Sequence, residues 1–168
     1  SKVYPKAKEV NGYDPRIGVF VCSCGINIAG TVDVKAVTEY AAQLPNVVYT
    51  ENNLFTCSTD TQELIADKIR ENDLNRIVVA ACTPRTHEPL FQDTLREAGL
   101  NGYLLEMANI RNHNSWVHQD EPEKATQKAK EQVGMAVARV TSNYALRRMS
   151  VDVVQKALVI GGGISGMV

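Results

Sequence analysis

The chain has 168 residues, of which 44% are hydrophobic and 22% charged, and its formal net charge is −1. This length and composition are typical of one globular domain with its own core. The near-neutral charge gives no electrostatic reason to expect nucleic acid or an anionic membrane as a partner. No apolar run approaches the roughly 20 residues of a membrane span, and the N-terminus lacks the apolar core of a signal peptide. We therefore expect a soluble protein of the cytoplasm.

Strand-like and helix-like patterns alternate along the chain from Arg16 onwards. Short runs rich in β-branched residues predict strands, and amphipathic runs that follow a capping residue predict helices. In order, we expect a strand over 16–22, a helix from a cap at Thr31 or Asp33 to about 43, a strand over 47–50, a helix from a cap at Ser58 or Thr59 to about 72, a strand over 76–81, a helix over 88–98, a strand over 103–106 and a long helix from Pro122 to about 146.

This alternation predicts the α/β class: an open, mainly parallel sheet with helices on both faces, a three-layer domain of the Rossmann or flavodoxin type. We divide the chain into an N-terminal tail over 1–15, this domain over 16–150, and the start of a second unit over 151–168.

The four cysteines follow a topological pattern. Cys22 closes the first strand and Cys24 comes two residues later, Cys57 lies after the second strand, and Cys82 follows the third. The carboxyl ends of parallel strands meet at one edge of a sheet, where open α/β sheets bind their ligands. We therefore expect all four thiols at the same edge.

Four convergent thiolates suit a [4Fe–4S] or a [2Fe–2S] cluster, and the helices that follow would direct their positive N-termini toward the sulfurs. Gly25 would let the backbone turn closely around an inorganic core. Three alternatives remain open: four structural thiols, a zinc site with four cysteine ligands, and a redox disulfide joining Cys22 to Cys24 or Cys57 to Cys82.

Charged and polar residues near the same edge each allow two roles. His87 follows the third strand, and His113 and His118 follow the fourth. They are candidates for hydrogen bonding or proton relay, or they are ordinary loop residues. Arg85 and Arg111 would either offset cluster charge or face water.

A glycine motif closes the chain. An expected strand over 156–160 leads directly into Gly161, Gly163 and Gly166, which fit the G-x-G-x-x-G pattern of dinucleotide-binding domains. Gly161, Gly163, Ile164, Ser165 and Gly166 are the candidate cofactor-binding residues; a glycine-rich turn between domains is the alternative. Because the sequence stops inside the motif, we expect a longer parent protein, and no working flavin site in this segment alone.

Several long stretches together resemble the N-terminal region of the A subunits of heterodisulfide reductases. They are Gly18–Asn27, Asn53–Ser58, Val79–Phe91, Glu106–Arg111 and Val159–Met167. The resemblance implies that Cys22, Cys24, Cys57 and Cys82 bind a [4Fe–4S] cluster and that the glycine motif begins an FAD-binding domain of the thioredoxin-reductase type.

The resemblance further implies an electron-transfer subunit of an anaerobe's oxidoreductase, as in methanogenesis, in which the cluster exchanges electrons with FAD. It implies oligomers with other heterodisulfide-reductase-type subunits and an electron-donating hydrogenase- or dehydrogenase-type partner. No catalytic residue is assigned to this domain. The competing functions are a thiol–disulfide redox module and a cluster-free domain that docks subunits.

Overall fold

Four parallel strands form the centre of the chain in a computed structural model that describes residues 2–147 and 149–167. The strands are β1 (Ile17–Cys22), β2 (Val47–Asn53), β3 (Arg76–Ala81) and β4 (Leu105–Asn109), and their order across the sheet is β2-β1-β3-β4. Every neighbouring pair is parallel. The expected open parallel sheet is confirmed.

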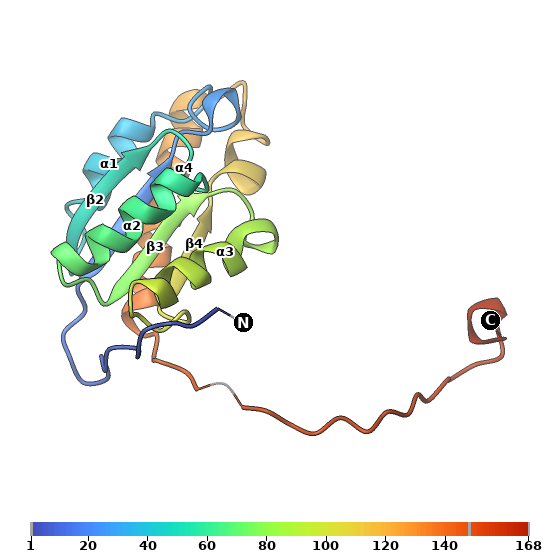
Figure 1. Cartoon of the computed structure of the whole chain (residues 1–168). Coiled ribbons are helices and arrows are strands. Elements are labelled where there is room, and N and C mark those ends of the chain that lie inside the picture. Colours follow the sequence, from blue (N-terminus) through green and yellow to red (C-terminus); the bar gives the residue numbers. More distant parts are fainter. Residues whose placement is uncertain (1, 148, 168) are drawn as a thin grey trace.

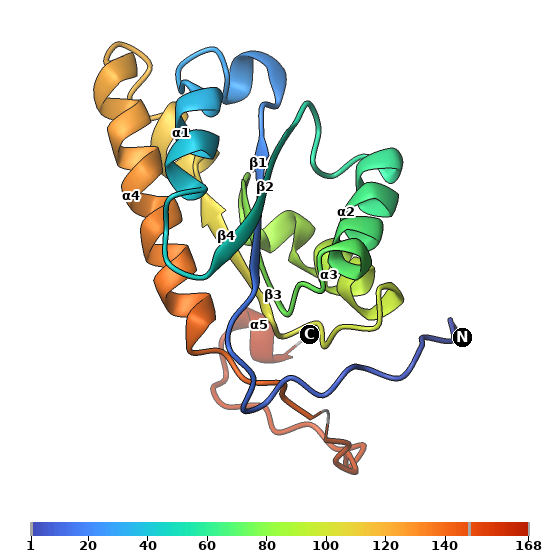
Figure 2. The same cartoon turned by 90° about the vertical axis from the view of Figure 1, so that its left-hand side faces the viewer.

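Helices cover both faces of this sheet, which confirms the three-layer α/β architecture. The helices α1 (Val34–Ala41) and α4 (Pro122–Thr141) lie on one face, and α2 (Thr59–Glu71) and α3 (Pro84–Glu97) lie on the other (Figures 1 and 2). Two short turns, η1 (Gly25–Asn27) of 3-10 type and η2 (Arg111–Ser115) of π type, follow β1 and β4. Across the two described ranges, no helix combines the length and the apolar character needed to cross a membrane.

The local signals that set these elements work as expected. The side chain of Asp33 accepts a hydrogen bond from the backbone N–H of Ala36 and caps α1, and Ser58 caps α2 in the same way. All six residues of β1 and all six of β3 are buried, because these central strands are covered by helices on both faces.

Two element starts differ from the expected ones. Helix α3 begins at Pro84 instead of residue 88, because Thr83 serves as its cap and proline fits the first helical position. Strand β4 begins at Leu105 instead of 103, because the side chain of Asn101 accepts a hydrogen bond from the N–H of Tyr103 and forms a turn there. Both differences arise from turn chemistry at the starts of these elements.

Helix α4 ends at Thr141, five residues before the expected end at 146. Beyond it, the N–H of Ala145 bonds to the side chain of Asn11, and the carbonyl of Leu146 accepts a hydrogen bond from Asn101. These tertiary contacts replace the last expected helical turn.

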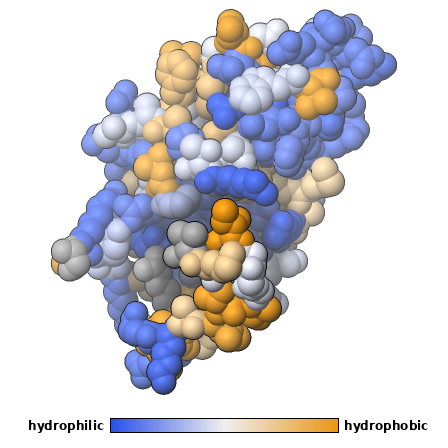
Figure 3. All heavy atoms as spheres, turned by 90° about the vertical axis from the view of Figure 1, so that its right-hand side faces the viewer, coloured by the Kyte–Doolittle hydropathy of each residue, from blue (hydrophilic) through white to orange (hydrophobic). Residues whose placement is uncertain are grey.

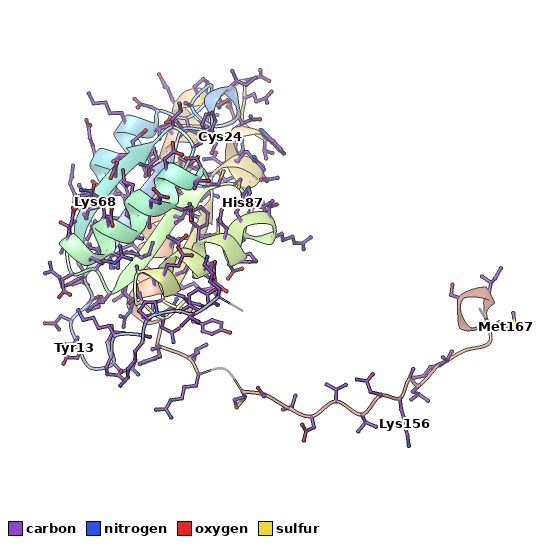
Figure 4. The ribbon with its side chains drawn as sticks, in the orientation of Figure 1. Tyr13, Cys24, Lys68, His87, Lys156 and Met167 are labelled. Carbon is purple, nitrogen blue, oxygen red and sulfur yellow. The ribbon has the colours of Figure 1, made fainter. Side chains whose placement is uncertain are left out.

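The N-terminal residues have no regular secondary structure but contact the domain at the amino ends of the strands. Val10 is fully buried, the N–H of Lys8 bonds to the carbonyl of Gly99 at 2.8 Å, and the hydroxyl of Tyr4 bonds to Asp93. Figure 4 places Tyr13 at this end of the sheet, opposite Cys24.

The C-terminal residues extend away from the domain (Figure 1). The strand expected over 156–160 is not formed, since residues 149–160 have no regular structure and only the single turn α5 (Ile164–Met167) follows. The apolar side chains of this segment are exposed, and Figure 3 views the extended segment nearly end-on, so that orange side chains lie in front of the domain. The physical reason is that an isolated strand has no neighbour to pair its backbone groups.

Glu106 on β4 is a largely buried carboxylate. Its side chain is 17% exposed and lies 3.3 Å from the guanidinium of Arg139 on α4. Burial raises the pKa of Glu106, Arg139 opposes the rise, and the nearby Glu88 adds to it. The folded state therefore disfavours the charged form of Glu106.

We expect Glu106→Gln to raise the melting temperature at neutral pH. A raised folded pKa means that the wild-type chain loses stability as pH rises from the ordinary pKa of a glutamate, about 4.3, through the folded value. The advantage of the variant should therefore vanish below about pH 4. Thermal unfolding from pH 3.5 to 8 measures it, with Glu39→Gln on the exposed face of α1 as the control. A variant that is less stable at pH 7 would show that the Arg139 ion pair outweighs burial.

Candidate metal centre

All four cysteines lie at the carboxyl edge of the sheet, as the topology predicted. Cys22 is the last residue of β1, and Cys24 immediately precedes η1. Cys57 lies just before the cap of α2, and Cys82 lies between β3 and the cap of α3. All four are free thiols, Cys22 and Cys82 being buried, Cys24 half-buried and Cys57 exposed.

The pairing of β1 with β2 continues past the end of β1 and positions the first two cysteines. Cys22 is in register with Asn53. The N–H groups of Ser23 and Cys24 then bond to the carbonyls of Asn53 and Leu54, each at 2.9 Å. The loop that leads toward Cys57 is thereby fixed against the Cys22–Cys24 segment.

Cys24 adopts a strained backbone conformation. Its φ and ψ are 39° and 44°, in the left-handed region, and Gly25 follows with a φ of 52°. Glycine adopts this region freely, as expected for Gly25, whereas a residue with a side chain is disfavoured there. Strain of this kind often marks a functional position, and here it directs the chain sharply around the end of β1.

The loop between β2 and α2 makes a direct hydrogen bond to a cysteine sulfur. The N–H of Thr56 donates to Sγ of Cys22 at 3.4 Å. The carbonyl of the same residue accepts a hydrogen bond from the side-chain amide of Gln62, and the oxygen of that amide accepts one from the hydroxyl of Thr94. This buried chain of contacts joins α3, α2 and the Cys57 loop.

Sequence reasoning did not identify Gln62 or Thr94. The available signal was the position of Gln62 on the inner face of α2, with Ile65, Ala66 and Ile69. A polar residue on a buried helix face needs a partner, and in this chain the partners are the loop that carries Cys57 and the neighbouring helix.

The pKa values of the Cys57 and Cys82 thiols depend on burial and on neighbouring groups. Partial burial raises the pKa of Cys57, and the neighbouring thiols of Cys22 and Cys24 raise it further. Burial also raises the pKa of Cys82, with smaller contributions from Cys57 and Cys22, while the cation of Arg111 lowers both values. The charge on Cys57 is thus coupled to the thiols of Cys22, Cys24 and Cys82, and an added cation would favour the thiolate forms.

Unpaired polar atoms lie at the same edge. Within the described residues, Oδ1 of Asn53, Oγ1 of Thr56 and Nδ2 of Asn109 are buried and have no hydrogen-bond partner. The hydroxyl of Thr56 and the amide of Asn109 are free donors, which suits a site that receives a negatively charged group. Over residues 2–147 and 149–167, no three cysteine, histidine or acidic side chains are grouped so that they could hold a single metal ion.

The three histidines are distributed around this edge. His87 lies half-buried on the first turns of α3, and Figure 4 shows it at the same end of the sheet as Cys24. His113 is exposed on η2, and His118 lies 2.9 Å from the ammonium of Lys128 on α4. None of them contacts a cysteine through a hydrogen bond in the described structure.

The structure distinguishes Arg85 from Arg111, whose roles the sequence left open. Arg85 is exposed on α3, whereas the guanidinium of Arg111 lies over the ring of Trp116, 4.7 Å from its centre. Trp116, which sequence reasoning did not single out, bonds through its indole N–H to Asn27 in η1 at 3.3 Å.

We expect Cys24→Gly to make the metal-free chain more stable than Cys24→Ala by about 1 kcal/mol, because only glycine relieves the left-handed conformation. Urea unfolding under reducing conditions measures this difference. Both variants should lose iron after reconstitution, since both lack the thiol. Equal stabilities would contradict strain at Cys24, and retained iron in either variant would contradict its ligand role.

We expect Gln62→Leu to destabilise the chain by about 1–3 kcal/mol, because it leaves the buried carbonyl of Thr56 without a partner. Chemical denaturation measures the loss, and Gln127→Leu on the exposed face of α4 is the matched control. A loss no larger than that of the control would show that this buried contact does not stabilise the Cys57 loop.

Comparison with known proteins identifies close relatives, although no family model matches the chain. It is 56% identical over 154 residues to an iron-sulfur A subunit of CoB–CoM heterodisulfide reductase from Methanopyrus kandleri, covering 92% of this chain and 24% of the relative. It is 53% identical over 160 residues to the A subunit of the H(2):CoB-CoM heterodisulfide,ferredoxin reductase of Methanothermobacter thermautotrophicus, covering 95% and 24%.

A heterodisulfide reductase A-subunit-like protein of Archaeoglobus profundus is 53% identical over 154 residues, covering 92% of this chain and 22% of that protein. The chain thus spans about a quarter of the length of these curated relatives.

Proposed function

Because the chain belongs to the family of heterodisulfide reductase A subunits, as a segment about a quarter as long as its relatives, we propose that it is an iron–sulfur electron-transfer domain. Cys22, Cys24, Cys57 and Cys82 are the ligands of one [4Fe–4S] cluster. In the whole protein, this cluster exchanges electrons with FAD.

The observation that carries the proposal is the position of the thiols. Four free cysteines from three different loops lie at one edge of one sheet. Two of them directly precede the caps of α2 and α3, whose N-termini carry free N–H groups and partial positive charge. The donor set fits iron–sulfur chemistry because each iron of such a cluster takes its own thiolate, so the ligands need not converge on a single ion.

The chain's own residues have defined roles in this site. When bound, an iron–sulfur cluster takes up and releases single electrons. The N–H of Thr56 donates a hydrogen bond to Sγ of Cys22, and donors of this kind disperse negative charge on sulfur and raise the reduction potential. Gln62 holds the loop that makes this contact. No bond-making step is assigned to the domain.

The raised pKa values favour this proposal over a redox disulfide that joins Cys57 to Cys82. The reactive cysteine of such a redox pair has a lowered pKa, because its thiolate is the nucleophile. Partial removal from water raises the pKa of both Cys57 and Cys82 by more than the cation of Arg111 lowers it, so these thiols are poor nucleophiles in the metal-free chain. The iron ions of a bound cluster would favour the thiolate forms of its ligands.

Residues 151–168 begin the FAD-binding unit in this proposal, with Gly161, Gly163, Ile164, Ser165 and Gly166 at the flavin phosphates. The handedness of the fold supports a separate unit. The crossover from β3 to β4 passes through α3, and a fifth strand beyond β4 reached through α4 would cross on the opposite face. Such a crossover would be left-handed, and parallel crossovers are right-handed in about 98% of cases.

The proposed partners follow from the family. We propose that the cluster passes electrons between FAD and the other subunits of a heterodisulfide-reductase-type oligomer, supplied by a hydrogenase- or dehydrogenase-type donor. The exposed apolar segment over 151–160 is consistent with a part of the chain that packs against further protein.

Anaerobic reconstitution with iron and sulfide tests the proposed function. We expect about four iron and four sulfide per chain, as for one cubane cluster, with broad visible absorption that bleaches on reduction. Cys57→Ser should abolish stable cluster retention. Ser23→Ala is the matched control, because Ser23 lies between two ligands and its hydroxyl contacts only Asn52 among the described side chains.

Other results have distinct meanings. About two iron per chain would indicate a [2Fe–2S] cluster. Colourless protein with four titratable thiols would support a cluster-free docking domain, and unchanged iron in Cys57→Ser would remove that residue from the ligand set.

A further inference from the structure

Arg111 and Trp116 form a stacked pair at the carboxyl edge of the sheet, the edge that also carries the four cysteines. Arg111 is the first residue of η2, and its guanidinium carbon lies 4.7 Å from the centre of the Trp116 ring. At this distance a cation is attracted to the face of the indole. The pair flanks a π-helical turn, a rare conformation that is frequent at functional sites.

Contacts on both sides fix this pair between two cysteine-bearing segments. On one side, the N–H of Ile110 bonds to the carbonyl of Ala81, the residue before Cys82, at 3.0 Å. On the other side, the indole N–H of Trp116 and the hydroxyl of Ser115 both bond to Asn27, three residues after Cys24. The π turn η2 therefore bridges the Cys82 and Cys24 segments.

Neutral groups, and not a neighbouring acid, fix the side chain of Arg111. Its Nε donates to the side chain of Asn112 at 3.3 Å, and none of the described ion pairs includes Arg111. Its positive charge therefore stays unpaired among the described residues, and the Ile110–Ala81 hydrogen bond fixes the segment that carries it against the one that leads into Cys82.

We propose that Arg111 is the fixed cation that raises the reduction potential of the cluster and that Trp116 is the positioning residue that holds it there. This inference rests on the cluster proposed above. On reduction, the site gains one electron from an external donor and no proton, so its negative charge increases. A fixed cation stabilises that reduced state more than the oxidised one.

The test compares midpoint potentials of the reconstituted chain, titrated with dithionite and followed by EPR. For Arg111→Gln we expect the ratio of reduced to oxidised cluster, at the wild-type midpoint, to fall about tenfold, equivalent to about 59 mV for one electron. Arg111→Lys should restore most of the shift because it keeps the charge. Trp116→Ala should lower the potential in the same direction, and Trp116→Phe should lower it less, because it keeps an aromatic face but loses the N–H that bonds to Asn27.

Arg70→Gln is the matched control. It removes the same charge from the last turn of α2, where Arg70 pairs with Asp67 far from the cysteine edge. A change in overall charge would lower the potential in this variant too, whereas a local effect of Arg111 would leave it unchanged.

A second readout needs no cluster. Trp116 is the single tryptophan of the chain, so its fluorescence reports directly on the stacked pair. In the metal-free chain, Arg111→Gln should shift the emission of Trp116, while Arg70→Gln should leave it unchanged.

The outcomes separate this inference from the proposed function. Full iron content with equal potentials in wild type, Arg111→Gln and Trp116→Ala overturns the role of Arg111 and leaves the cluster in place. An unshifted emission in the metal-free Arg111→Gln chain overturns the positioning by Trp116. A wild-type chain that takes up no iron overturns the proposed function and this inference together.

Discussion

Parallel pairing of β1 with β2 and with β3 is the constraint on which the rest of this structure depends. Because the strands run in one direction, their carboxyl ends meet, and the loops that carry Cys22, Cys24, Cys57 and Cys82 leave the sheet at one edge. All six residues of β1 and all six of β3 are buried. A shift of register by one residue would move every side chain to the opposite face and disrupt the packing on both faces, so the register is strongly favoured. The core therefore fixes the position of the thiols.

Some local features at that edge lower the stability of the metal-free chain. Cys24 has a left-handed backbone, and buried polar atoms such as the hydroxyl of Thr56 lack partners among the described residues. Each feature costs stability. The Gln62 and Thr94 contacts and the bridge made by η2 hold the loops in place against these costs. A site that is formed before its ligand arrives requires less reorganisation when the ligand binds.

The C-terminal segment illustrates the limit of local patterns. Residues 156–160 have the composition of a strand, but in this chain they have no neighbouring strand, and the hand of the β4–α4 connection disfavours adding them to the existing sheet. The composition of residues 156–160 therefore indicates a preference for the extended conformation, and a strand forms only where a neighbouring strand pairs with it. The same dependence on partners explains why α4 ends early, where Asn11 and Asn101 bond to the residues that follow it.

The sequence by itself determined the α/β class, the succession of the elements along the chain and the placement of four cysteines at the carboxyl edge, because hydrophobic periodicity and the position of a residue within its strand or loop are local properties of the chain. It also limited the helix caps to Thr31 or Asp33 and to Ser58 or Thr59, of which the structure uses Asp33 and Ser58. Only the tertiary structure decided that Arg85 is exposed whereas Arg111 stacks on Trp116, and that Gln62, Thr94 and Trp116 hold the loops of the site. Those contacts join residues between 5 and 89 positions apart, and side chains that meet only when helices and loops pack leave no periodic signal in the sequence.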